Sequence, residues 1–281
     1  MIRRRAVVGL SLLSALIFCA FAAQSAFATV GTKSNNTTGF TCIKVGPKSE
    51  FADAHCNSKT GGEYAHQLIP LDTTTEVDAT NAGVTESTKN SEPAVLKSSL
   101  GLAKLTIECA TVKGTPKNST QHNVEPAAGQ HTFTGSAQAE WSNCTVKELT
   151  KCVVAEPIVI STTFYGVEGL EGPKGEKNAM GVEYKGAGAE ETFTELEFKN
   201  KGAEACSANG KKAPVKGSLI GTSGPTTESE QETKATSATI AITPKNKMQT
   251  LKLGTSPAEF SVIVVPTMAG GGNPISVTTT T

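Results

Sequence analysis

The stretch Ala103-Lys104-Leu105-Thr106-Ile107-Glu108-Cys109 alternates apolar and polar residues without a break. Because successive side chains of a strand point to opposite faces, this order predicts a β-strand with one apolar and one polar face. The same alternation recurs in residues 195–199 and 238–243. Half-buried strands of this kind are typical of antiparallel sheets.

Two further runs, residues 158–160 and 260–265, are apolar on both faces and predict strands that are covered on each side. Two packed layers of sheet provide such cover. No long stretch places apolar residues at helical spacing. The sequence therefore predicts an all-β fold, a mostly antiparallel β-sandwich with long Gly-rich loops, including residues 166–190 around a short strand at 180–184.

The first 28 residues have the three parts of a secretory signal peptide. Arg3-Arg4-Arg5 forms a positive n-region, residues 6–21 form an apolar h-region, and Ala26-Phe27-Ala28 fits the small-x-small cleavage site. The apolar run is about 16 residues long, whereas a spanning helix needs about 20. We therefore expect a signal peptide at residues 1–28 and a secreted, extracellular protein, free or associated with the cell surface, with no membrane span after cleavage.

Composition divides the exported part into three segments. A small disulfide-closed module with its linker is predicted at residues 29–93, the main β-sandwich domain at 94–268, and a flexible tail at 269–281. The linker rests on the polar, turn-forming stretch 81–93, and the tail on a Gly-rich stretch that begins it.

Charge excludes some partners. The 26 basic residues include three arginines, all before the cleavage site, so 23 lysines stand against 26 acidic residues in the exported part. A net charge near −3 gives no electrostatic reason to bind nucleic acid or anionic lipid. Arginine is also the usual bidentate clamp for phosphate and carboxylate groups. We expect no nucleic-acid partner, and an extracellular ligand or a cell-surface component instead.

The cysteines after the signal peptide are even in number, which predicts three disulfides in an oxidising compartment. Many connectivities are open to them. Loop-closure entropy favours the two short loops, Cys42–Cys56 and Cys144–Cys152, which leaves Cys109 to join Cys206. Zinc ligation needs thiolates at close spacing, and the chain has no C-x-x-C. The sequence therefore predicts no cofactor and no metal ligand.

A candidate polar site consists of Asp53, His55, Tyr64 and His66, which are near one another in the sequence. Histidine and aspartate serve as metal ligands and as acid–base groups, so a cluster of them could be functional. The competing interpretation is the polar rim of a disulfide loop. Neither H-E-x-x-H nor G-x-S-x-G is present, and no catalytic residue is predicted.

A resemblance is carried by Phe40-Thr41-Cys42, by residues 51–56 ending in Cys56, by Gly62-Glu63-Tyr64, and by Trp141-Ser142-Asn143-Cys144 with Cys152 after it. In these motifs the chain resembles a group of uncharacterised secreted, cysteine-containing β-rich proteins of high-GC Gram-positive bacteria, a group with no assigned activity. The resemblance implies export, a β-rich body and disulfides. It transfers no functional residue.

These observations predict a secreted, non-catalytic protein with a structural, surface-associated or ligand-binding role. The alternative is a secreted hydrolase whose catalytic residues are dispersed over strands. A third class is a carrier of a small molecule or a metal. An apolar cavity between the sheets, or a converging His/Asp cluster, would indicate that class.

Overall fold

The computed structural model describes residues 32–33, 37–52, 61–72, 74–81, 93–100, 103–128, 130–170, 179–223, 240–242, 250–269 and 275–279. All of them belong to one compact unit, residues 31–281. The predicted signal peptide lies outside these ranges, as do Asp53, His55 and Cys56.

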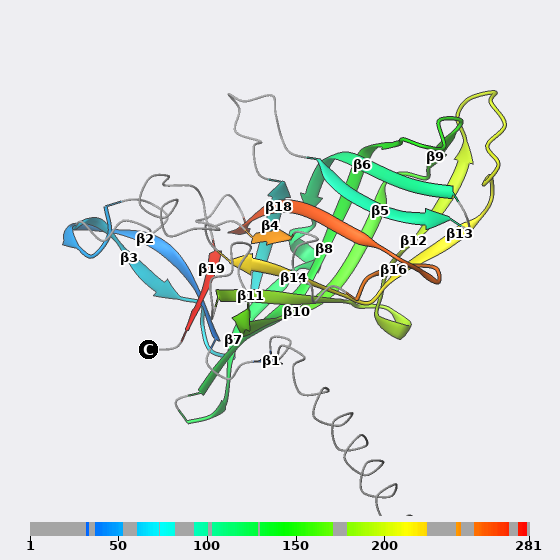
Figure 1. Cartoon of the computed structure of the whole chain (residues 1–281). Coiled ribbons are helices and arrows are strands. Elements are labelled where there is room, and N and C mark those ends of the chain that lie inside the picture. Colours follow the sequence, from blue (N-terminus) through cyan, green and yellow to red (C-terminus); the bar gives the residue numbers. More distant parts are fainter. Residues whose placement is uncertain are drawn as a thin grey trace, which may run out of the picture. The chain divides into compact units, whose positions relative to one another are not determined.

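The described chain is made of β-strands joined by turns and two short 3-10 helices (Figure 1). The elements are β1 (Thr32–Lys33), β2 (Thr37–Ser49), β3 (Gly62–Leu68), β4 (Thr75–Asn81), β5 (Ala94–Leu100), β6 (Ala103–Gly114), η1 (Pro116–Asn118), β7 (Thr120–Ala127), β8 (Gln130–Val146), β9 (Cys152–Val154), β10 (Ile158–Leu170), β11 (Ala179–Gly186), η2 (Ala189–Glu191), β12 (Thr192–Asn200), β13 (Lys212–Lys216), β14 (Ser218–Ser223), β15 (Ile240–Ile242), β16 (Lys252–Leu253), β17 (Ser256–Pro257), β18 (Glu259–Met268) and β19 (Ile275–Thr279).

The largest sheet forms a nearly closed, barrel-like ring. Its strands follow the order β1-β10-β11-β14-β15-β18-β4-β7-β8-β6-β5, and the pairings β10–β8, β18–β5 and β4–β6 join strands that are distant in this order. The long strand β8 has β10 along one edge, and β7 followed by β6 along the other. The predicted all-β, antiparallel architecture is confirmed, and its packed layers are opposite walls of one continuous sheet.

Two smaller sheets cover the two ends of this ring (Figure 1). The sheet β17-β16-β13-β12-β9 lies where β11 ends, because Gly186 packs against the backbone of Thr192 at the start of β12. The sheet β19-β2-β3 lies at the other end, where Gly166 of β10 packs against Thr37 of β2. Side chains of β12 and β19 thereby join the strands of the ring in one continuous hydrophobic core.

Strand pairing crosses the boundaries of the three predicted segments. β4 lies in segment 29–93, yet it pairs with β18, β7 and β6 of the ring. β19 lies in the predicted tail, yet residues 275–279 pair with β2. Polar and Gly-rich stretches mark where the chain leaves a sheet, but strands on either side of such a stretch can return to the same core.

The disulfides correct two predicted pairings. Cys109 bonds Cys144, with Cα atoms 3.9 Å apart, and Cys152 bonds Cys206, with Cα atoms 4.9 Å apart. Cys109 and Cys144 are opposite residues of β6 and β8, whereas β9 carries Cys152 into a different sheet. The pairings Cys144–Cys152 and Cys109–Cys206 are therefore wrong, because strand register, and not loop length, decides which thiols meet.

The remaining predicted disulfide falls only partly within the described chain. Cys42 of β2 is disulfide-bonded and buried. Its partner lies outside the described ranges, and so does Cys56. The pairing Cys42–Cys56 stays a prediction.

A buried asparagine fastens the end sheet β19-β2-β3 to the ring. Asn123 of β7 accepts a hydrogen bond from the Gly39 N–H at 2.7 Å, and its amide donates to the carbonyl oxygens of Gly39 at 3.0 Å and Ile69 at 2.7 Å. A side chain at position 39 would meet the Phe133 ring, so glycine is required for this approach. The amide thus pairs the Gly39 N–H and the Ile69 carbonyl, and it adds a second bond to the Gly39 carbonyl, which also accepts from the Ile69 N–H.

Candidate ligand-binding cavity

A cavity of about 150 Å³ lies inside the ring. Apolar side chains from the ring and from both end sheets form most of its wall; they include Val77, Leu96, Val112, Ala137, Ala139, Trp141, Ile160, Phe164, Val182, Leu219, Phe260, Val262, Phe193, Leu196, Ile275 and Val277. Asp78 is the only charged residue among the lining residues that the structure describes. The interior is therefore an apolar chamber and not an ionic site.

The sequence of β8 explains why the cavity is present. Alternate positions of this strand face inward, and they carry Phe133, Gly135, Ala137, Ala139 and Trp141 in turn. Small residues thus occupy the middle of the inward row, and bulky rings occupy its ends. Because each small side chain leaves unfilled volume, the wall recedes at Ala137 and Ala139, both of which line the cavity.

The neighbouring strand β10 does not compensate fully for this missing volume. Ala137 is opposite Thr162, and Ala139 is opposite Ile160, so each pair shares the inner face. The Thr162 hydroxyl is already used within the sheet, because it donates a hydrogen bond to the Lys185 carbonyl oxygen at 2.7 Å. The local sequence therefore maintains an opening instead of a close-packed core.

Aromatic rings border the cavity at two levels. At one level, the Phe164 ring lies 5.4 Å from Phe133 and 5.8 Å from Tyr184, measured between ring centroids. At the other, Trp141 stacks on Phe260 with centroids 4.8 Å apart and planes inclined by 10°. The chain has only 10 Phe, 3 Tyr and 1 Trp, and six of these rings line the cavity. A residue class that is scarce in the sequence is thus concentrated at one place.

Tyr184 gives the chamber one polar group without a partner. Its side chain is partly buried and lines the cavity, and no hydrogen bond to its hydroxyl occurs within the described part of the chain. Burial alone raises the pKa of this hydroxyl above its usual value. The hydroxyl therefore stays protonated around neutral pH and can donate a hydrogen bond inward.

Several other polar groups along the wall are already engaged. Ser119 donates its hydroxyl to the Thr115 carbonyl oxygen at 3.0 Å and accepts the Gln138 N–H at 2.9 Å. The Gln121 amide contacts the Met268 sulfur at 3.4 Å. These groups hold the wall together, which distinguishes them from the Tyr184 hydroxyl.

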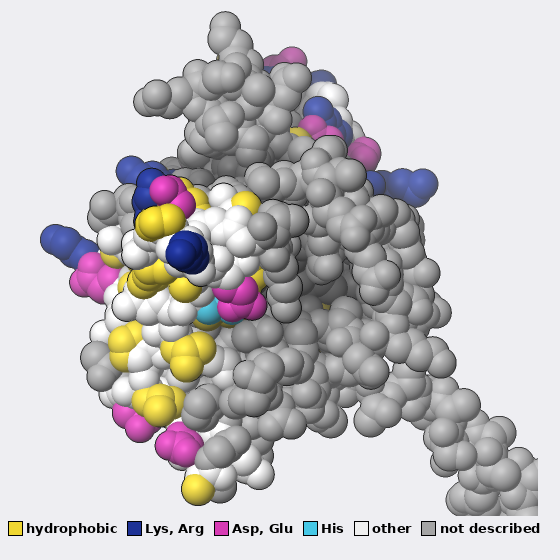
Figure 2. All heavy atoms as spheres, turned by 90° about the vertical axis from the view of Figure 1, so that its left-hand side faces the viewer, with side chains coloured by type: hydrophobic (Ala, Val, Ile, Leu, Met, Phe, Trp, Pro, Cys, Tyr) yellow, Lys and Arg dark blue, Asp and Glu magenta, His cyan; other side chains and the backbone are white. Residues whose placement is uncertain are grey.

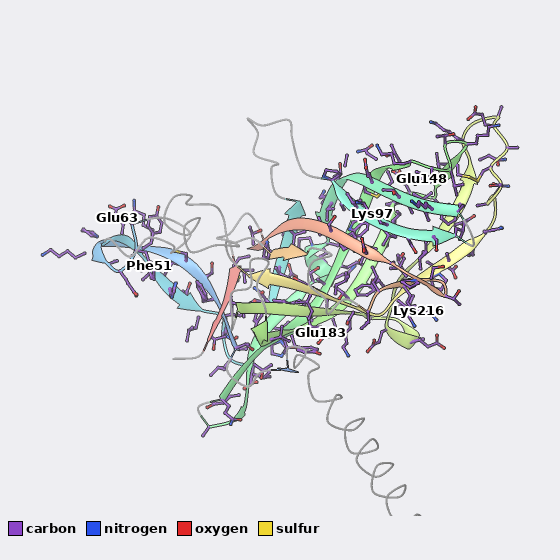
Figure 3. All side chains as sticks on the ribbon, viewed as in Figure 1. Phe51, Glu63, Lys97, Glu148, Glu183 and Lys216 are labelled. Atoms are coloured by element: carbon purple, nitrogen blue, oxygen red, sulfur yellow. A yellow bond between two sulfur atoms is a disulfide. The ribbon has the colours of Figure 1, made fainter. Side chains whose placement is uncertain are left out.

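Four charged side chains labelled in Figure 3 do not face the cavity, and one of them, Glu183, is nevertheless buried. Lys97, Glu148, Glu183 and Lys216 come from different strands and loops around the ring, and none of them lines the cavity. Glu183 accepts a hydrogen bond from Tyr165, its neighbour on the outer face. The alternation along β11 explains this separation, because Glu183 points outward while Val182 and Tyr184 point inward.

The structure places Tyr64 and His66 of the predicted polar site away from the cavity. Tyr64 and His66 lie on β3, where Tyr64 packs against a small cluster formed by Phe40, Cys42 and Phe51. The His66 ring lies 4.0 Å from the Phe40 ring and 4.4 Å from the Phe51 ring. Their predicted companions Asp53 and His55 lie outside the described ranges, so the convergence of all four residues stays a prediction.

The described residues provide neither a metal site nor a membrane-spanning helix. Among them, no three His, Cys, Asp or Glu side chains are arranged to hold a metal ion. Nor do they include a helix with the length and hydrophobicity of a membrane crossing. In the view of Figure 2, hydrophobic side chains are interspersed with basic and acidic ones and form no uniform patch.

Sequence reasoning missed the residues that define the chamber, namely Ala137, Ala139, Trp141 and Tyr184. A signal for them exists in the run Phe133 to Trp141, where small residues replace bulky ones on one face of a long strand. Comparison with protein-family models, curated proteins and solved structures finds no match. The site itself therefore carries the functional argument.

Proposed function

We propose that this is a non-catalytic binding protein that holds a small apolar molecule inside its barrel-like sheet. The supporting observation is the apolar chamber of about 150 Å³. An apolar cavity of about this size binds benzene or xenon when it occurs in other proteins. The lining residues that the structure describes include neither a histidine nor a pair of carboxylates, so this wall supports binding better than hydrolysis.

We further propose that the protein works outside the cell. Disulfides persist in oxidising compartments, and the described chain contains two complete ones. The signal-peptide pattern of residues 1–28 and the resemblance to secreted proteins of high-GC Gram-positive bacteria support the same compartment. The ligand would then be an extracellular compound, and nucleic acid is not a proposed partner.

Trp141 provides an internal probe for this binding, since it is the only tryptophan and lines the cavity. Titration of the purified protein with toluene should change the Trp141 emission in a saturable way. Ala139→Leu adds three carbon atoms to the wall and should remove this response. The same substitution should raise the free energy of unfolding by about 1 kcal/mol, because it fills empty volume.

The control for this test is Ala103→Leu, which introduces the same side chain at an exposed position of β6. This variant should respond to toluene like the wild type. A close-packed interior would give a different pattern: no saturable response in the wild type, and a loss of about 1–3 kcal/mol in Ala139→Leu from overpacking. That pattern would refute the proposed function.

A further inference from the structure

We infer that the chamber selects a neutral molecule of one-ring size that carries a hydrogen-bond acceptor, and that the Tyr184 hydroxyl is the donor that holds it. This inference rests on the proposed function and specifies its ligand class. Three properties of the wall carry it: the volume with its aromatic borders, the absence of compensating charge, and the unpartnered hydroxyl.

The volume and the borders favour a ring. A chamber of about 150 Å³ matches the cavity size that accommodates benzene. The Phe164–Tyr184 pair at one level and the Trp141–Phe260 pair at the other present ring faces and edges. Aromatic ligands gain offset-stacked and edge-to-face contacts against such surfaces, beyond the gain from buried area.

The charge of the wall favours a neutral ligand. No lysine occurs among the described part of the lining, so a carboxylate or phosphate would lack a counter-ion from these residues. A charged compound would lose its hydration on entry without replacement, whereas a neutral one would not meet that cost.

The Tyr184 hydroxyl supplies the specificity for an acceptor. It belongs to a partly buried side chain that lines the cavity, and it has no hydrogen-bond partner among the described residues. A buried polar group normally has a partner, and an acceptor on the ligand would complete this one. An apolar ligand of the same shape would leave the hydroxyl unsatisfied, so the site should discriminate between the two.

Acetophenone and α-methylstyrene form a matched pair for the test, because a carbonyl oxygen in the first replaces a CH₂ group in the second. Isothermal titration calorimetry should be run with both compounds on the wild type and on Tyr184→Phe. The substitution should weaken acetophenone binding about tenfold and leave α-methylstyrene binding within about twofold. Retained binding of α-methylstyrene also shows that the variant is folded.

Tyr165→Phe is the matched control, since it removes a hydroxyl that bonds Glu183 on the outer face and does not line the cavity. It should change neither affinity. The inference would be overturned if both variants lost acetophenone binding equally, or if Tyr184→Phe lost none. Binding of α-methylstyrene would still support the proposed function in either case. Failure of both compounds to bind the wild type would refute both proposals.

Discussion

Replacing Cys152 and Cys206 together with alanine is expected to lower the free energy of unfolding by about 4 kcal/mol. The two residues are 54 positions apart in the sequence, and a cross-link over a loop of this length restricts the unfolded chain substantially. Alanine avoids placing a polar group at these buried positions. Urea denaturation of the double variant and of the wild type gives the difference directly.

The same logic tests the pairing itself. A Cys109→Ala/Cys144→Ala variant removes one complete disulfide and should expose no new thiol on alkylation under denaturing conditions. A Cys144→Ala/Cys152→Ala variant should instead leave Cys109 and Cys206 as two alkylatable thiols. If the first variant exposed two thiols and the second exposed none, Cys144 would be bonded to Cys152. That result would contradict the register of β6 against β8.

The second large effect is expected at Asn123. Asn123→Leu keeps the approximate side-chain size but removes the acceptor for Gly39 N–H and the donors to the Gly39 and Ile69 carbonyl oxygens. An unsatisfied buried group costs about 1–3 kcal/mol, and the Gly39 carbonyl keeps its other bond from the Ile69 N–H. A loss of about 3 kcal/mol should therefore appear in urea denaturation.

Asn118→Leu serves as the comparison for this substitution. Asn118 also uses its amide, donating to the Gln138 side chain at 2.6 Å, but the bond is exposed and water can replace it. Its change in unfolding free energy should stay within about 0.5 kcal/mol. Similar losses for the two variants would show that Asn123 does not fasten the end sheet to the ring.

Local sequence pattern was sufficient to predict individual strands. The alternation at residues 103–109 corresponds to the first part of β6, and the apolar run at 260–265 lies within β18. The predicted short strand at 180–184 lies within β11. These predictions succeeded because a strand's two faces are determined by neighbours two positions apart in the same segment.

The pairing of strands and thiols required information that no local pattern holds. Cys144 and Cys152 are close in sequence, but the turn between them carries the chain from the ring into another sheet. Likewise, β19 was assigned to a tail because its partner, β2, lies at the opposite end of the sequence. Contacts between distant segments decide these features, and one sequence does not reveal them.

The cavity was also hidden, for a related reason. Ala137 and Ala139 are ordinary strand residues until the opposite walls are known, because a small side chain can be compensated by a large one across the core. Tyr184 gains significance only when its hydroxyl is seen inside the ring without a partner. The predicted candidates Tyr64 and His66 drew attention through residue type, yet they lie in the separate β2–β3 cluster.

The central claim is that the ring contains an apolar cavity, and a xenon-pressurised crystal tests it most directly. Xenon enters apolar cavities of this size, and its electron density reports their position. We predict a xenon peak inside the ring in contact with Ala139 and Ile160, and no such peak in a crystal of Ala139→Leu. Side chains packed through this volume, with no xenon between them in the wild type, would contradict the account.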